Sequence, residues 1–223
     1  MTRLLAAAAL AALLAAGCAD DPEPRTYTPV QVYDAAVAAG TARITITVTA
    51  DEVAPGIDAG STGNGVADLK AGTAAVRVEF SGYAFEQPGY ESVSTADRVY
   101  LRTTGEWVTF RAKADERGVL AVPTLPLQRL RDVREWSAVG EEEVGGRDTR
   151  HYRGRTGDTA QQVDAWVGAD GRPVRVDLAG DPKAHLAFRL DLRDYGAAAD
   201  VTVPAGAKEV RDFDAAFKAV GLL

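Results

Sequence analysis

The chain has 223 residues, of which 26% are charged and 46% hydrophobic, and it contains a single cysteine. This composition is typical of a globular protein and too apolar for a disordered one. Lys and Arg total 25 against 32 Asp and Glu, giving a formal net charge of −7, which argues against sequence-independent nucleic-acid binding. A single cysteine excludes an internal disulfide. A Cys/His zinc site is also hard to build, because the only histidines are His151 and His185.

The N-terminus has the pattern of an export signal. A positively charged start, Met1-Thr2-Arg3, precedes an uninterrupted Leu/Ala run from Leu4 to Ala16, which is shorter than the roughly 20 residues of a transmembrane helix. It ends in Leu14-Ala15-Ala16-Gly17-Cys18, which resembles a bacterial lipobox. The alternative is an ordinary secretory signal with an incidental cysteine.

We therefore expect three segments. Residues 1–17 form a lipoprotein signal peptide, 18–27 the lipidated Cys18 with a polar, Pro-rich tether, and 28–223 one domain. Lipidation would anchor the exported protein to the outer face of the cell membrane without a spanning helix. The acidic domain gains no attraction from anionic lipids, so the acyl anchor supplies the membrane affinity.

The domain starts with a helix and continues mainly with strands. Thr28 and Gln31 form a predicted capping box, and Gly40 ends the helix. Residues 43–49 alternate strictly and predict a half-buried strand, whereas glycines 56, 60, 63 and 65 predict a long loop. Further expected strands are 76–80, 90–94, 98–103, 106–110, 141–144, 149–155, 162–167, 172–178 and 186–193. A short helix is expected at 125–134 and a terminal one at 210–223.

Strands at this spacing, joined by short turns, predict an antiparallel meander rather than βαβ units. No linker or solenoid-length repeat follows residue 25. The predicted fold is therefore α+β, a curved antiparallel sheet forming an unclosed half-barrel, with helices covering its concave face.

Catalytic motifs are absent from the sequence, which contains no Gly-x-Ser-x-Gly elbow and no Walker or dinucleotide glycine motif. We expect no enzyme activity, no metal and no cofactor. His151 and His185 are interpreted as solvent-facing strand residues, and the run 141–143 of three Glu as a solvated strand end rather than a calcium site. A hydrolase built on the two histidines is the alternative.

Several hairpin motifs resemble a known family. A pattern VG-x-E-x-v-x-G-x-x-T-x-x-Y begins at Val139, and the segments that follow agree with the same family. The matching segments are 65–69, 99–107, 139–154, 163–176, 194–196 and 201–204. Their order resembles the LppX/LprG-type actinobacterial lipoproteins, within the wider LolA/LolB-like superfamily.

The resemblance implies an unclosed barrel that holds acyl chains of a lipid or lipoglycan between sheet and helices, with an envelope transporter as a possible partner. The residues expected to line this apolar trough are Ile44, Ile46, Val48, Val76, Val78, Phe80, Val99, Leu101, Leu127, Leu130, Val174, Val176, Leu186, Phe188 and Leu190. Alternation alone fits a packed core equally well. An envelope sensor or protein-interaction lipoprotein without a cavity is therefore the alternative function.

Overall fold

The computed structural model describes residues 25–54, 57–81, 89–112, 122–157, 160–179 and 186–222. Cys18, the predicted signal peptide and His185 lie outside these residues. In chain order the elements are α1 (Pro29–Ala38), β1 (Thr41–Ala54), β2 (Ile57–Asp68), β3 (Thr73–Ser81), β4 (Gly89–Ser94), β5 (Arg98–Arg102), β6 (Val108–Arg111), α2 (Leu125–Arg129), the 3-10 helix η1 (Leu130–Asp132), β7 (Val133–Val144), β8 (Arg147–Thr156), β9 (Gln162–Val167), β10 (Pro173–Ala179), β11 (Leu186–Arg193), β12 (Lys208–Glu209) and α3 (Phe213–Ala219).

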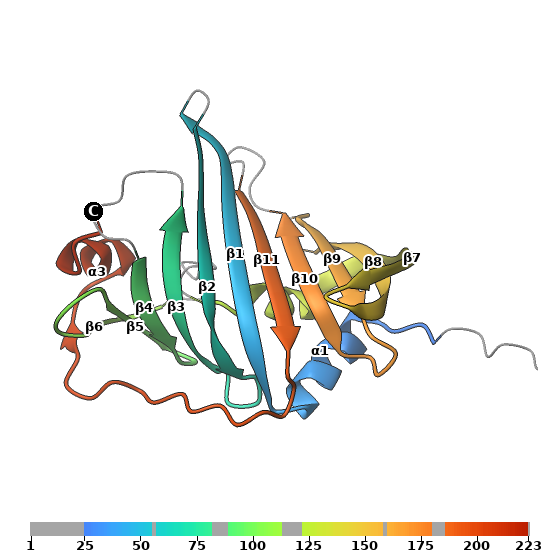
Figure 1. Cartoon of the computed structure of the whole chain (residues 1–223), viewed down its shortest axis with the longest axis horizontal. Coiled ribbons are helices and arrows are strands. Elements are labelled where there is room, and N and C mark those ends of the chain that lie inside the picture. Colours follow the sequence, from blue (N-terminus) through green and yellow to red (C-terminus); the bar gives the residue numbers. More distant parts are fainter. Residues whose placement is uncertain are drawn as a thin grey trace, which may run out of the picture.

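The strands form a single curved sheet that does not close (Figure 1). Its order is β12-β6-β5-β4-β3-β2-β1-β11-β10-β9-β8-β7. Every neighbouring pair is antiparallel except β12 with β6, which is parallel. The predicted α+β half-barrel is confirmed, and its topology is two antiparallel meanders joined where β1 pairs with β11.

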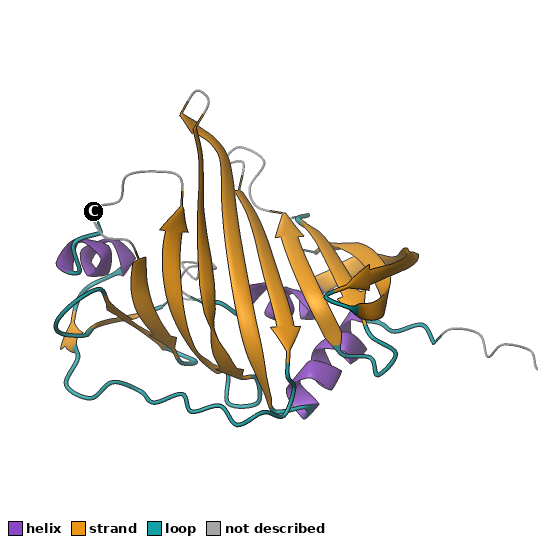
Figure 2. Cartoon of the chain, viewed as in Figure 1, coloured by secondary structure: helices purple, strands orange, loops and turns teal. Residues whose placement is uncertain are grey.

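Helices lie at two places along the sheet (Figure 2). Helix α1 contacts η1 and β10, and α2 contacts β10 and β11, whereas α3 contacts β6 near the opposite end. The predicted capping box of α1 is present, because Thr28 Oγ1 accepts from the Gln31 backbone and the Gln31 side chain accepts from the Thr28 backbone. The 3-10 segment and α2 together replace the single helix expected at 125–134.

The loop expected around glycines 56–65 is wrong, because β2 occupies most of it. A Cβ at Gly63 would lie 2.7 Å from Ile46 Cγ2, and a Cβ at Gly65 would collide with the Ala75 carbonyl. These glycines therefore allow the neighbouring strands to approach closely, which is a recognised role of glycine within a sheet. Gly56 lies outside the described residues.

Strand β7 is also longer than expected, since it begins at Val133 rather than near Glu141. Nearly all its side chains are exposed or half-buried, so no alternating hydrophobic pattern marks it in the sequence. Backbone pairing with β8 defines it, with irregular register between Arg134 and Ser137 and between Ala138 and Gly140.

Candidate apolar binding site

Most of the predicted trough residues lie together in one apolar cluster on the inner face of the sheet. Buried members of that cluster are Ile44, Ile46, Val48, Val76, Val78, Val99, Leu101, Leu127, Leu130, Val176 and Leu190. Phe80 and Phe188 are partly buried against it. The alternation seen in the sequence thus brings side chains from β1, β3, β5, β10 and β11 to one surface.

One predicted residue stands apart from this cluster. Val174 belongs to a separate cluster with Val144 and Trp166, so its assignment to the same surface as Val176 is wrong. The register of β9 and β10 shifts between Pro173 and Arg175, and such an irregularity re-aims the side chain beside it. For Leu186 the structure describes the backbone, which pairs with Ala50.

The end of the inner face near β8–β11 is closed by tightly fixed groups. Val32 and Ala36 of α1 are buried there. The Trp136 and Tyr152 rings stack with centroids 5.2 Å apart, and Trp136 Nε1 donates to the Tyr27 carbonyl at 2.9 Å. Hydrogen bonds and ring stacking therefore attach the segment preceding α1 to this end of the sheet.

The opposite end is covered by α3, a helix of seven residues capped by Asp212. Phe213 lies edge-on to Phe110 with centroids 6.0 Å apart, and Phe217 meets Tyr90 at 5.6 Å. Thr103 Oγ1 donates to the Val220 carbonyl at 2.7 Å. Aromatic contacts and the hydrogen bond from Thr103 thus attach α3 and the residue that follows it to the sheet.

Among the described residues, side chains of the apolar cluster fill much of the inner face. A cavity of about 10 Å³ remains, lined by Ile46, Val48, Ser61, Val76, Val78, Tyr90 and Pro123. Val78 and Tyr90 line this cavity and also a surface hollow of about 360 Å³. Burial raises the pKa of Tyr90 well above its ordinary value, so its phenol stays neutral. A ligand would have to move side chains here before it could enter.

Charged residues form the rim of that hollow. Glu91 accepts from Arg102 and, at 2.6 Å, from Arg77. The hydrogen bond from Arg102, followed by that from Arg77, lowers the pKa of Glu91 despite some opposing burial. Arg102 also lies over the Trp107 ring, 4.6 Å from its centroid. The rim thus includes an ion-pair cluster in which Glu91 is held by Arg77 and Arg102.

The sequence analysis missed the contribution of β4 to the apolar inner face. The buried positions of β4 are Tyr90, Ser92, Val93 and Ser94, and the two serines disguise the apolar face. Tyr90 contacts Phe80 from β3 as well as Phe217 from α3. The one available signal was Phe217 itself, which marks the apolar face of the predicted terminal helix.

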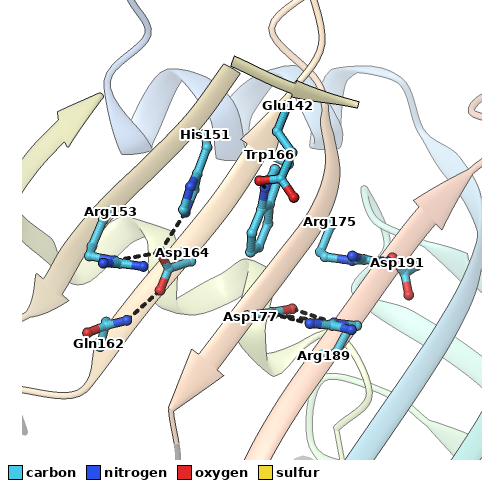
Figure 3. Close-up of polar contacts among 10 residues, drawn as sticks. All are labelled: Glu142, His151, Arg153, Gln162, Asp164, Trp166, Arg175, Asp177, Arg189 and Asp191. Carbon is cyan, nitrogen blue, oxygen red and sulfur yellow. Dashed lines mark hydrogen bonds and ion pairs between the residues drawn. The ribbon is translucent and has the colours of Figure 1, made fainter. Parts of the chain in front are cut away.

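A polar network occupies the outer face of β8 and β9 (Figure 3). Asp164 lies 2.6 Å from His151 Nε2 and accepts from Arg153 Nε and Gln162 Nε2, both at 2.7 Å. The His151 ring stacks on Trp166 with centroids 4.4 Å apart. His151 is only 8% exposed, so the expectation that it faces solvent is wrong, because Trp166 covers it.

The charge of Asp164 is favoured by these contacts. Burial raises the pKa of this carboxyl, but hydrogen bonds from Gln162, Arg153 and His151 outweigh it and hold the pKa below its ordinary value. Both carboxylate oxygens are engaged by donors on β8 and β9. This arrangement holds β8 and β9 in register. The expectation that the protein has no enzyme activity stays a prediction.

Three further sequence predictions concern the run of three glutamates, metal binding and membrane-spanning helices. Glu141, Glu142 and Glu143 are exposed, as expected for a solvated strand end. Within the described ranges, no group of three or more His, Cys, Asp or Glu is placed to hold a metal ion. Among the same residues no helix has the length and apolar character needed to cross a membrane.

Comparison with known proteins identifies the fold. No family model matches the chain, and no curated protein matches it significantly. The lipoprotein LppX of Mycobacterium tuberculosis superposes with a TM-score of 0.53 at 14% identity, covering 78% of this chain and 95% of LppX. LprF of Mycobacterium bovis gives 0.48 at 12% identity, covering 80% of this chain and 95% of LprF. The likeness to LppX confirms the predicted curved-sheet fold.

Proposed function

We propose that this protein is a membrane-anchored lipoprotein that binds acyl chains of a lipid or lipoglycan and carries or presents them in the cell envelope. Cys18 is the anchor, and the inner face of the sheet is the binding surface. The observation that carries the proposal is a continuous apolar inner face on an unclosed sheet, covered by short helices. The fold shared with the lipoprotein LppX supports it.

Binding requires that the filled interior opens, because a cavity of about 10 Å³ holds no acyl chain. Helix α3 is the element that we expect to move, since it is short and contacts β6 near one end of the sheet. Val78 and Tyr90 line both the inner cavity and the surface hollow. Because the Phe217 ring packs against Tyr90, moving α3 away would free Tyr90 to shift and join the two spaces. Each methylene of the incoming chain then contributes about 0.8 kcal/mol on burial.

Native mass spectrometry of the full chain from a lipidating host tests the proposal. The matched control is Cys18→Ser, which removes the anchor and leaves the domain unchanged. We expect a non-covalent lipid with both proteins and a covalent mass increase with the wild type alone. Absence of any non-covalent lipid from both would contradict acyl-chain binding, and an unmodified Cys18 would contradict anchoring.

The uptake rate of a fluorescent fatty acid tests the opening step. The probe has about 16 carbons, close to the length of common membrane acyl chains. Thr103→Val removes the hydrogen bond to the Val220 carbonyl, and Phe217→Ala removes the contact with Tyr90. Both should accelerate uptake several-fold. Val174→Ala is the control, because Val174 lies in the separate cluster with Trp166. Equal rates in all four proteins would exclude α3 as the moving element.

The dense interior also favours a second function, an envelope sensor or protein-interaction lipoprotein that keeps its core closed. Its distinguishing result is capture of a membrane protein by the full chain while no lipid co-purifies. In that case the α3 variants would change stability and leave partner binding intact.

A further inference from the structure

One edge of the sheet is a long strand with no described neighbour on its outer side. Strand β7 ends the strand order and has 12 residues. At the other end of the sheet, β12 has two residues. Most β7 side chains are exposed, including Val139 at 53%. An exposed edge strand presents backbone N–H and C=O groups that another extended chain can pair with.

The C-terminal part of β7 is regular enough to accept such a strand. From Gly140 to Val144 each residue pairs in turn with β8, ending with Val144 opposite Arg147. The Glu142 carbonyl accepts from Thr149 Oγ1 and so points toward β8. Because backbone groups alternate in direction along an antiparallel strand, those of Glu141 and Glu143 point away from β8. Two outward N–H and two outward C=O groups therefore remain available.

The charge of this edge selects the partner. Glu141, Glu142 and Glu143 are all exposed, and on β8 Asp148 lies opposite Glu143. These four carboxylates outnumber the two arginines of the adjoining part of β8, Arg150 opposite Glu141 and Arg147 opposite Val144. The Glu142 carboxylate accepts from Trp166 Nε1 at 2.7 Å, which directs it to the outer face of the sheet. Side chains alternate along a strand, so Glu141 and Glu143 project from the opposite face. Their spacing matches two basic residues separated by one position on a paired strand.

A hollow beside this edge provides room for a partner. It has a volume of about 700 Å³ and is lined by Arg25, Tyr27, Glu141, Glu142, Glu143, Asp148, Thr149, Arg150, Val167, Gly168 and Ala169. The three glutamates thus border both the free edge and this hollow.

We propose that the β7 edge binds an extended basic segment of a protein partner by strand addition, with its Lys or Arg residues opposite Glu141 and Glu143. A second copy of this chain is disfavoured, because pairing two β7 strands through residues 141–143 places like charges opposite each other. A shifted register would meet the irregular positions between Arg134 and Gly140. The chain's own segment 19–24 is acidic and contains two prolines. It therefore has the same sign of charge as the β7 edge, and its prolines lack the N–H groups that strand pairing uses.

Amide hydrogen exchange by NMR on the full chain in detergent tests the main-chain pairing. The probe is a blocked peptide containing Lys-Val-Lys-Val-Lys, and the control contains Lys-Pro-Lys-Pro-Lys, which keeps the charge and lacks two N–H groups. We expect the first peptide to slow exchange at Glu141 and Glu143 and to leave Glu142, already bonded to β8, unchanged. Equal effects of the two peptides would reduce the interaction to side-chain attraction and overturn strand addition.

Variants of the edge separate charge from backbone pairing. Glu143→Gln removes the charge and keeps the outward N–H, so we expect peptide binding about threefold weaker than in the wild type. Glu143→Pro removes the outward N–H without removing a bond to β8, and we expect peptide binding at least tenfold weaker. Replacing Glu141 and Glu143 together by Lys should transfer binding to Glu-Val-Glu-Val-Glu. Protection that rises with protein concentration in the absence of peptide would assign the edge to a second copy. No binding at millimolar peptide would overturn the proposal, and the exchange experiment stands even if Glu143→Pro fails to fold.

Discussion

Strands β8 to β11 have two faces that are held by different forces. On the inner face, Tyr152, Val163, Val176 and Leu190 are buried in the apolar cluster. On the outer face the same strands carry polar pairs, with Arg175 Nε 2.7 Å from Asp191 and Arg189 Nη2 2.8 Å from Asp177. The free energy gained by burying apolar area does not depend on how the side chains are oriented. Each polar pair, in contrast, forms in only one register of the two strands that carry it. The inner face therefore supplies most of the stability, and the outer face specifies the alignment of the strands.

The largest expected effect comes from the inner face. Leu130 is fully buried beneath α1, and Leu130→Ala should lower the free energy of unfolding by about 2–5 kcal/mol. Val139→Ala is the control, because Val139 is exposed, and should change it by less than about 0.5 kcal/mol. Urea unfolding followed by circular dichroism measures both. Equal losses would contradict the division between the two kinds of surface.

A smaller loss is expected from the centre of the outer network. Asp164→Ala leaves His151, Arg153 and Gln162 without their shared acceptor, and should destabilise the domain by about 1–3 kcal/mol. Asp177→Ala on the neighbouring strand serves as the control, since the side-chain hydrogen bonds described for Asp177 all come from one residue, Arg189. If Asp177→Ala costs as much as Asp164→Ala, the network has no special role.

The contribution of Asp164 should depend on pH in the acid range. Its pKa is lower in the folded protein than in the unfolded chain, so its stabilisation is present above the unfolded value of about 3.9. That stabilisation is lost as the pH falls through the lowered folded value. The difference in unfolding free energy between wild type and Asp164→Ala should therefore shrink below about pH 4. A difference that grows with acidity would contradict the lowered pKa.

The smallest effect concerns the cross-strand pair Arg189 and Asp177. Their side chains are 46% and 25% exposed, so solvent screens much of their attraction. A double-mutant cycle with Arg189→Ala and Asp177→Ala should give a coupling of about 0.2–1 kcal/mol that declines with added salt. A larger, salt-independent coupling would mean that the outer face contributes more than alignment.

Much of the inner face could be predicted because strand side chains repeat every two residues. Ile44, Ile46 and Val48 show this pattern directly, and all three reach the same cluster. Prediction failed where the residue type hides the pattern. The glycines of β2 were assigned to a loop, because a strand position that needs no side chain is recognisable only when its neighbour, such as Ala75, is in place.

The sequence by itself determined the number and kind of most elements, the capping of α1 and which residues of β1, β3 and β11 share a face, since these depend on local spacing. Only the tertiary structure decided which residues meet across strands. The contact of Asp164 with His151 depends on the register of β8 and β9, and the separation of Val174 depends on an irregularity beside Pro173. The tertiary structure also decided that Phe217 packs on the inner face. This contact with Tyr90 joins α3 to β4, two elements that lie far apart in the chain.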